Sequence, residues 1–200
     1  VLELSELVQR LKKGAWSLGV LDLSRNRLLG MTGIEHLTLL EHLNVSENAL
    51  IDLEGIGKLK RLVTFYAQVN QLGRVESFED ENKNRQYDLG ETINDESGNG
   101  KRDVDPLVEL QSLPSLVNLH LYGNLIQTTK SMGNMPKLQV LLLGGNKIQQ
   151  LEGIEGFPNL KRLSLSDNRL NDLTGIENLS SLEYLYLVEN RICDLRPLAK

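Results

Sequence analysis

The stretch LQVLLLGGNKIQQLEGIEGFPN spans residues 138–159, and the next 22 residues, LKRLSLSDNRLNDLTGIENLSS (160–181), repeat its pattern. In both stretches leucine occupies the first, fourth and sixth positions, an asparagine follows at the ninth, and a Gly-Ile pair comes seven residues later. Self-similarity at a fixed period of about 20–50 residues is the sequence signature of solenoids and related repeat folds. The extent of this repeat along the chain therefore decides the fold.

Seven segments of the chain share the first half of the unit. They close on Asn26, Asn48, Asn70, Asn124, Asn146, Asn168 and Asn190, at successive spacings of 22, 22, 54, 22, 22 and 22 residues. The order L-x-x-L-x-L-x-x-N-x-L is that of leucine-rich repeats. The second halves, such as IDLEGIGKLKRL, QLEGIEGFPNLKRL and DLTGIENLSSLEYL, make the chain resemble most the 22-residue subfamily seen in internalins and in the phosphatase 1 regulatory subunit.

Each part of the unit has a physical role. The L-x-L alternation predicts a short strand whose leucines point inward. The asparagine is expected to turn the chain after the strand, with its amide bonding to main-chain groups inside the solenoid, and the glycine permits a tight return. We therefore predict an α/β solenoid: a right-handed leucine-rich repeat horseshoe with a concave parallel β-sheet and a convex side of 3-10 and short helices.

The two ends of the chain depart from the repeat. Residues 1–17 are predicted to form an N-terminal helical cap, because Leu4, Leu7, Val8 and Leu11 are spaced as one helical face. Residues 18–200 are predicted to form the solenoid of about seven repeats. The final DLRPLAK (194–200) stops halfway through a return segment, so we expect the chain to be part of a larger protein. The single cysteine, Cys193, is expected to be a small buried core residue.

An insertion accounts for the spacing of 54 residues, which is one repeat plus 32 residues. The repeat phase returns when Leu107, Leu110, Leu113 and Leu116 are aligned with Leu53, Ile56, Leu59 and Leu62. The extra material then covers residues 74–105. It holds ten acidic and five basic residues, a balance of −5, which equals the net charge of the whole chain. The repeats themselves are therefore neutral overall.

The polar residues of this insertion are ordered as two 12-residue loops that start 15 residues apart. The first loop offers Asp80, Asn82, Asn84, Gln86, Asp88 and Glu91, and the second offers Asp95, Ser97, Asn99, Lys101, Asp103 and Asp105. Oxygen ligands at these alternating positions are what a calcium loop requires, with a main-chain carbonyl serving at the seventh position. The loops resemble the D-x-N-x-N-G-x-x-D calcium repeats of bacterial surface proteins. Calcium is the predicted cofactor, and it would replace the missing hydrophobic core of the insertion.

Two departures from the loop pattern leave an alternative open. Arg85 stands where a sharp turn favours glycine, and Pro106 occupies the twelfth position of the second loop. The alternative is an acidic, solvated insertion that holds no metal, since segments of low hydrophobicity often remain unstructured. We expect the insertion to lie at the rim of the concave face and, once ordered by calcium, to form a wall beside a partner site.

A partner is expected on the outward side of the strands. Four of the five tyrosines fall at outward positions, and tyrosine is a common interface anchor. The predicted partner-binding residues are Tyr66, His120, Tyr122, Val140, Leu142, Arg162, Tyr184 and Tyr186. Ordinary strand propensity is the alternative explanation of the tyrosines.

Other functional classes find little support. The net charge of −5 argues against nucleic acid as a partner, and no apolar run approaches the roughly 20 residues that span a bilayer. The three histidines lie in different repeats without a ligand set, GNGK (98–101) lacks the residues of a phosphate loop, and no serine has a nucleophile motif. We therefore expect no enzymatic activity.

The sequence as a whole predicts a non-enzymatic module that recognises a protein, or another ligand, on its concave face, with calcium ordering the insertion. The resemblance to bacterial surface calcium repeats, and weak loops that fill at millimolar calcium, favour an extracellular or cell-surface location. One alternative is an intracellular, cytoplasmic regulatory scaffold similar to the phosphatase 1 regulatory subunit, without metal. A purely structural spacer in a larger repeat protein is another.

Overall fold

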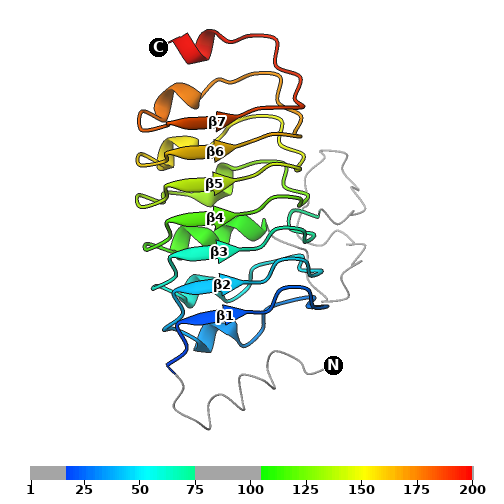
Figure 1. Ribbon diagram of the computed structural model, residues 1–200, viewed down its shortest axis with the longest axis vertical. Coiled ribbons are helices and arrows are strands. Elements are labelled where there is room, and N and C mark those ends of the chain that lie inside the picture. Colours follow the sequence, from blue (N-terminus) through cyan, green and yellow to red (C-terminus); the bar gives the residue numbers. More distant parts are fainter. Residues whose placement is uncertain (1–16, 75–104, 200) are drawn as a thin grey trace, which may run out of the picture.

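The computed structural model describes residues 17–74 and 105–199. Within them, seven three-residue strands form one parallel sheet in chain order (Figure 1). The strands are β1 Val20–Asp22, β2 His42–Asn44, β3 Thr64–Tyr66, β4 Asn118–His120, β5 Val140–Leu142, β6 Arg162–Ser164 and β7 Tyr184–Tyr186. The predicted solenoid with a parallel sheet is confirmed. The predicted helical cap, apart from Ser17, lies outside the described residues.

The return side of each repeat is built from 3-10 helices, and the described ranges contain no α-helix. These helices are η1 Ile34–His36, η2 Ile56–Lys58, η3 Pro106–Ser112, η4 Lys130–Met132, η5 Ile154–Gly156, η6 Ile176–Asn178 and η7 Arg196–Ala199. The glycine of the second half-unit precedes four of them in a left-handed conformation, as at Gly55 (φ 90°) and Gly175 (φ 103°). Residues with a Cβ rarely adopt this conformation, so the glycine sets where each return begins.

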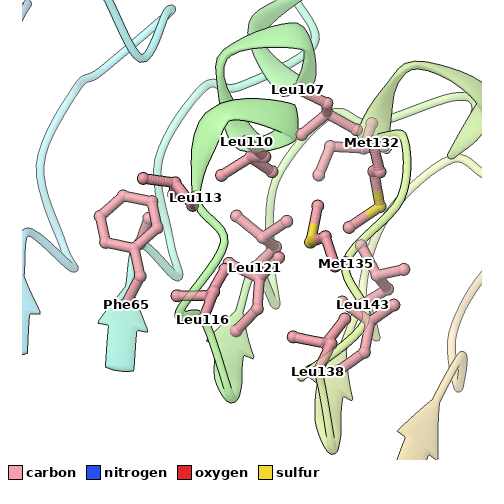
Figure 2. Packing of buried hydrophobic residues seen from close by; sticks show 14 of the residues in the cluster. Phe65, Leu107, Leu110, Leu113, Leu116, Leu121, Met132, Met135, Leu138 and Leu143 are labelled. Atoms are coloured by element: carbon pink, nitrogen blue, oxygen red, sulfur yellow. The ribbon is translucent and has the colours of Figure 1, made fainter. Parts of the chain in front are cut away.

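The repeat phase continues across the insertion without a shift. β3 pairs directly with β4, and Thr64 lies opposite Asn118, 54 residues later. Leu107, Leu110, Leu113 and Leu116 are buried in the interior between the sheet and the returns (Figure 2). The alignment of these four leucines with the preceding repeat is therefore confirmed.

The core is a continuous column of aliphatic side chains along the solenoid. In each repeat the middle residue of the strand points inward, as Phe65 does in β3, and meets apolar residues of the return. The return of the fourth repeat uses Met132 and Met135, which the close-up shows packing beside Leu143 (Figure 2). Methionine is flexible enough to fill an irregular gap. Because each repeat packs only on its neighbours, stability is distributed along the stack.

A ladder of asparagines ties the repeats to one another. Asn146, for example, donates through Nδ2 to the carbonyls of Leu143 (2.9 Å) and of Leu121 in the previous repeat (3.0 Å). Its Oδ1 accepts the main-chain N–H of Ile126 at 3.0 Å. The same pattern joins Asn48, Asn70, Asn124, Asn168 and Asn190 to the repeat before each of them. The asparagine is therefore a connector between repeats as well as a turn residue.

The residue before each ladder asparagine adopts a left-handed conformation. Gly123 and Gly145 occupy this position with φ of 66° and 65°, whereas Val69 occupies it with φ of 55°. For a β-branched residue such a φ is an outlier that carries strain. Val69 is also 47% exposed, so burial offsets little of the strain.

Val69→Gly is expected to raise the free energy of unfolding by about 1 kcal/mol, because it releases left-handed strain while removing little buried surface. Chemical denaturation of the two proteins measures the difference. The reciprocal variant Gly145→Val should destabilise the chain, since a Cβ at residue 145 would lie 3.3 Å from both the Tyr122 ring and the main-chain nitrogen of Gly123. A Val69→Gly protein less stable than the wild type would contradict the assignment of strain.

The expectation for Cys193 is wrong: its side chain is exposed. Cys193 lies 22 residues after Asn171 and 44 after Gln149, which are exposed too. This position of the unit faces solvent, and the neighbouring Ile192 is the residue that packs against the core. The prediction took residue 193 for an apolar position of the repeat, whereas the equivalent residues Asn171 and Gln149 are polar.

Candidate partner-binding face

The outward side chains of the strands line up across the sheet in the register predicted from the 22-residue phase, on the side here called the concave face. One row contains Val20, His42, Thr64, Asn118, Val140, Arg162 and Tyr184, and the next contains Asp22, Asn44, Tyr66, His120, Leu142, Ser164 and Tyr186. A third row follows the strands: Ser24, Ser46, Gln68, Tyr122, Gly144, Ser166 and Val188. All eight predicted partner-binding residues therefore lie on this one face.

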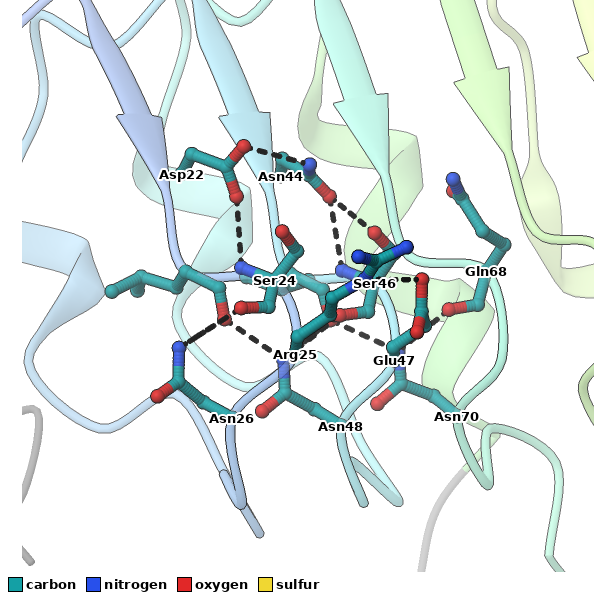
Figure 3. Close-up of polar contacts among 12 residues, drawn as sticks. Asp22, Ser24, Arg25, Asn26, Asn44, Ser46, Glu47, Asn48, Gln68 and Asn70 are labelled. Atoms are coloured by element: carbon teal, nitrogen blue, oxygen red, sulfur yellow. Dashed lines mark hydrogen bonds and ion pairs between the residues drawn. The ribbon is translucent and has the colours of Figure 1, made fainter.

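The first two strands present polar groups that are bonded to one another (Figure 3). Asp22 accepts the Ser24 N–H at 2.8 Å and the Asn44 amide at 3.1 Å. Asn44 in turn accepts both the N–H and the hydroxyl of Ser46. Hydrogen bonds from the Ser24 side chain, then its main chain, and from Asn44 hold the pKa of the Asp22 carboxyl below its ordinary value. This end of the face offers a partner few free polar groups.

The middle of the face is aromatic and carries no ionised side chain at its outward strand positions. The rings of Tyr66 and His120 meet edge to face, with centroids 4.6 Å apart, a favourable arrangement for aromatic pairs. The Tyr122 ring lies beside Gly144 and Gly145, where an added Cβ would come within 3.1 and 3.3 Å of it. The two glycines leave room for the ring, which is nevertheless 53% exposed. Tyr122 is thus held in place and still available to a partner.

Burial of His120 lowers its pKa below the ordinary value of 6.5, because a charged imidazolium is poorly solvated beside Tyr66. The unfolded chain therefore binds a proton near pH 6.5 that the folded chain resists. As the pH falls below about 6.5, the free energy of unfolding is expected to decrease until His120 is protonated in the folded state as well.

His120→Gln should remove this pH-dependent loss of stability. The free energy of unfolding of the variant, relative to that of the wild type, should therefore increase when the pH is lowered from 7.5 to 5.5. Carboxylates titrate equally in both proteins and cancel in the comparison. His42→Gln, on the same face but exposed, is the matched control. It retains His120 and should therefore show the same pH-dependent loss of stability as the wild type. Denaturation curves at the two pH values measure it, and a constant difference between wild type and His120→Gln would contradict the prediction.

The last two strands combine a cation with exposed apolar groups. The Arg162 guanidinium lies over the Tyr184 ring, with Cζ 4.8 Å from the centroid, within the range of a cation–π contact. Tyr184, Tyr186 and Val188 are 48%, 44% and 68% exposed. Together with half-buried Val140 and Leu142 on β5, these residues place apolar groups on both sides of the polar outward residues of β6.

Val69 belongs to this surface and was not among the predicted residues. Its methyl groups project beside Gly123, where an added Cβ would lie 3.5 Å from Val69 Cγ2. The sequence does distinguish Val69, because the equivalent position of the other repeats has a charged residue or glycine: Arg25, Glu47, Gly123, Gly145, Asp167 or Glu189. An aliphatic residue in a left-handed turn at the rim is unusual enough to be noticed.

Of the predicted calcium ligands only Asp105 lies within the described residues. Its carboxylate accepts the main-chain N–H of Leu107 at 2.9 Å and caps the N-terminus of η3, a common role for aspartate. The other eleven predicted ligands, from Asp80 to Asp103, lie in the segment 75–104. Across the described ranges, no group of three His, Cys, Asp or Glu side chains is placed to hold a metal ion.

Comparison with known proteins agrees with the repeat pattern. A family model for leucine-rich repeats in two copies matches residues 136–175 and 158–200. The chain is a leucine-rich repeat protein. Such folds are typically non-enzymatic. No curated protein gives a significant sequence match.

Solved structures share the solenoid over nearly the whole chain. A leucine-rich repeat protein of Leptospira interrogans is 33% identical with a TM-score of 0.68, covering 93% of this chain and 40% of that one. An internalin from Listeria monocytogenes is 20% identical with a TM-score of 0.55, covering 98% of this chain and 58% of the internalin. An Arabidopsis receptor kinase, solved with a peptide hormone and a co-receptor, is 23% identical with a TM-score of 0.59, covering 86% of this chain and 26% of the kinase.

This leucine-rich repeat protein thus spans 58% and 40% of the lengths of the internalin and the Leptospira protein. The 22-residue spacing between paired strands holds for every neighbouring pair except β3 and β4. Within the described part of the chain, none of the helices is long and apolar enough to span a membrane.

Proposed function

We propose that the chain is a non-enzymatic recognition module that binds a protein partner on the concave face between β3 and β7. One observation carries the proposal: exposed or half-buried aromatic and aliphatic side chains line the face at β3, β4, β5 and β7, on both sides of the polar residues of β6, whereas the polar groups of β1 and β2 are bonded to one another. Exposed contiguous apolar surface on a folded domain marks an interaction site. Tyr122, Tyr184 and Tyr186 supply the kind of anchors that dominate protein interfaces.

The fold supports the same proposal. Leucine-rich repeat proteins generally mediate protein–protein recognition, and repeat solenoids present extended concave surfaces for it. The receptor kinase whose structure resembles this chain was solved with a peptide hormone and a co-receptor. An exposed face lined by tyrosine on rigid strands needs little ordering when it binds, which favours affinity.

Selection of peptides from a random 12-residue display library tests the proposal. The wild-type chain is immobilised, and selected peptides are measured by fluorescence polarisation against the wild type and against Tyr122→Ala and Tyr186→Ala. Peptides that bind the wild type and lose affinity for both variants support the concave face as the site. Peptides that bind all three proteins equally would overturn the proposal.

We propose in addition that the insertion binds calcium. The support is the tandem spacing of oxygen-bearing residues in 80–91 and 95–105, which provides two incomplete calcium loops. Sites of this kind bind calcium with dissociation constants of about 0.1–1 mM, typical of extracellular modules. An extracellular or cell-surface location follows from that affinity, and a cytoplasmic scaffold without metal is the alternative.

Calorimetric titration with calcium distinguishes the two. Binding heat is expected for the wild type at millimolar calcium and is expected to fall in Asp80→Ala and Asp95→Ala, because each substitution removes the first ligand of one loop. Glu155→Ala, which removes an exposed carboxylate from η5, is the matched control and should bind as the wild type does. No heat from the wild type at about 5 mM calcium would contradict the calcium proposal and leave the concave-face proposal intact.

A deletion tests whether the insertion contributes to partner binding. Residues 75–104 are the segment to replace with a short glycine linker, because Asp105 caps η3 and the main chain of Arg74 bonds to Gln71. The shortened chain should fold and should bind the selected peptides more weakly if the insertion forms a wall of the site. Unchanged affinity would remove the insertion from the site.

A further inference from the structure

We propose that the partner presents a carboxylate, from an aspartate, a glutamate or a chain terminus, to Arg162 on β6. This inference rests on the proposed recognition function and specifies the chemistry of the segment that occupies the concave face. It starts from the distribution of charge over the three outward rows of the sheet. Only Asp22 and Arg162 in those rows carry a full charge, and their surroundings differ.

The carboxylate of Asp22 already has hydrogen-bond partners. It receives the Ser24 N–H and the Asn44 amide, and its pKa is lowered accordingly. Arg162 has no such partner: within the described part of the chain its guanidinium forms neither an ion pair nor a side-chain hydrogen bond, and its contact is with the Tyr184 ring. Its neighbours Lys161 and Glu183 pair with each other at 3.4 Å, so they leave the charge of Arg162 uncompensated.

The setting of Arg162 favours an anionic group. Ser164 at the end of β6 and Ser166 just after the strand are half-buried, and their hydroxyls can donate hydrogen bonds beside the guanidinium. Val140 and Leu142 flank this polar strip on β5, and Tyr184 and Tyr186 flank it on β7. Apolar walls around a polar strip lower the local dielectric constant and strengthen a charge-assisted hydrogen bond.

Contact with Tyr184 prepares the guanidinium for this role. A side chain held over a ring loses less conformational freedom when it pairs with a carboxylate, and arginine offers two parallel donors that match the two carboxylate oxygens. Lysine at the same place would offer a point charge without that geometry. A protein segment is favoured over nucleic acid because the chain carries a net charge of −5, whereas nucleic-acid binding draws on many cationic contacts.

The test uses the peptides selected from the random 12-residue library on the wild-type chain. They are expected to be enriched in aspartate or glutamate at one position, and changing that residue to its amide should weaken binding on the order of 10-fold. Arg162→Gln should weaken binding of the acidic peptide to the same extent, and the two changes together should cost no more than either alone. Arg162→Lys should recover part of the affinity.

Arg169→Gln removes a positive charge that is also exposed from the rim of the solenoid and is the matched control, with affinity expected to remain that of the wild type. Additive losses for the peptide amide and Arg162→Gln, or selection without acidic enrichment, would overturn the carboxylate proposal. If Tyr122→Ala and Tyr186→Ala still weakened binding in that case, the concave face would stand as the site. A 13-nucleotide single-stranded RNA serves as a competitor. If it displaces the acidic peptide from the wild type but not from Arg162→Gln, the group that Arg162 binds is a phosphate, which would also overturn the carboxylate proposal.

Discussion

Asn146→Ala is expected to lower the free energy of unfolding by about 3 kcal/mol, because alanine leaves several buried main-chain groups without partners. The amide of Asn146 donates to the carbonyls of Leu121 and Leu143, and its oxygen accepts the N–H of Ile126. All of these contacts are buried and two of them join the fourth repeat to the fifth. The loss should therefore weaken the stacking of repeats as well as one turn.

Urea denaturation followed by circular dichroism measures this effect. Asn26→Ala is the matched control, because Asn26 has the same place in the first repeat but is exposed, and among the described residues it donates to Leu23 and Ser24 of its own turn. The control is expected to cost less than about 1 kcal/mol. Equal losses in the two variants would show that the asparagine acts as a local turn residue and that the connections between repeats contribute nothing.

Tyr122→Ala and Tyr186→Ala are each expected to weaken binding of selected peptides by about 2 kcal/mol, roughly 30-fold, as for tyrosines at the centre of an interface. Tyr122 is positioned by Gly144 and Gly145 and is 53% exposed, and Tyr186 is 44% exposed on β7. Their rings can therefore bury a large area on binding without prior rearrangement. Truncation at exposed positions should leave the fold intact, which thermal unfolding of each variant checks.

Variants of β1 and β2 provide the contrast within the same sheet. Ser24→Ala removes the hydroxyl that bonds to Asp22 and Asn44→Ala removes the amide that does so; both are expected to change peptide affinity less than about threefold, since that network lies outside the proposed site. Affinity is read by the same fluorescence polarisation assay. A larger loss from Asn44→Ala than from Tyr186→Ala would move the site to the N-terminal strands and contradict the assignment to β3–β7.

Much of the fold could be predicted from the sequence because the repeat imposes the same constraint seven times. A 22-residue phase sets the register of the neighbouring strand pairs, and the return of that phase places Leu107 in the core and β4 beside β3. The eight predicted partner-binding residues share one face for the same reason. An outward position in one repeat is an outward position in all of them.

Contacts between side chains of different repeats could not be predicted in the same way. The Asp22–Asn44 network, the Tyr66–His120 pair and the placing of Tyr122 beside two glycines depend on rotamers and on the distance between strands. The period of the repeat determines neither the rotamers nor the distance between strands. Val69 shows a further limit, because its strain appears only when the left-handed conformation of the turn is known.

For the insertion, in contrast, the proposal comes from the sequence and not from side-chain contacts. Its proposed ligands follow from spacing alone, and Asp105, the one member of the set within the described residues, has a structural role as the cap of η3. A single carboxylate can both cap a helix and bind an ion, so Asp105→Asn separates the two roles: it retains an acceptor for the Leu107 N–H and removes the negative charge.

Chemical-shift mapping of a bound peptide tests the central claim most directly. The 22.5 kDa chain is labelled with nitrogen-15 and titrated with one selected peptide, and amide shifts are followed residue by residue. The proposed function predicts perturbations clustered at 64–69, 118–123, 140–145, 162–166 and 184–188, with little change at 20–24. Perturbations clustered instead on the 3-10 returns, from η1 to η6, would contradict it.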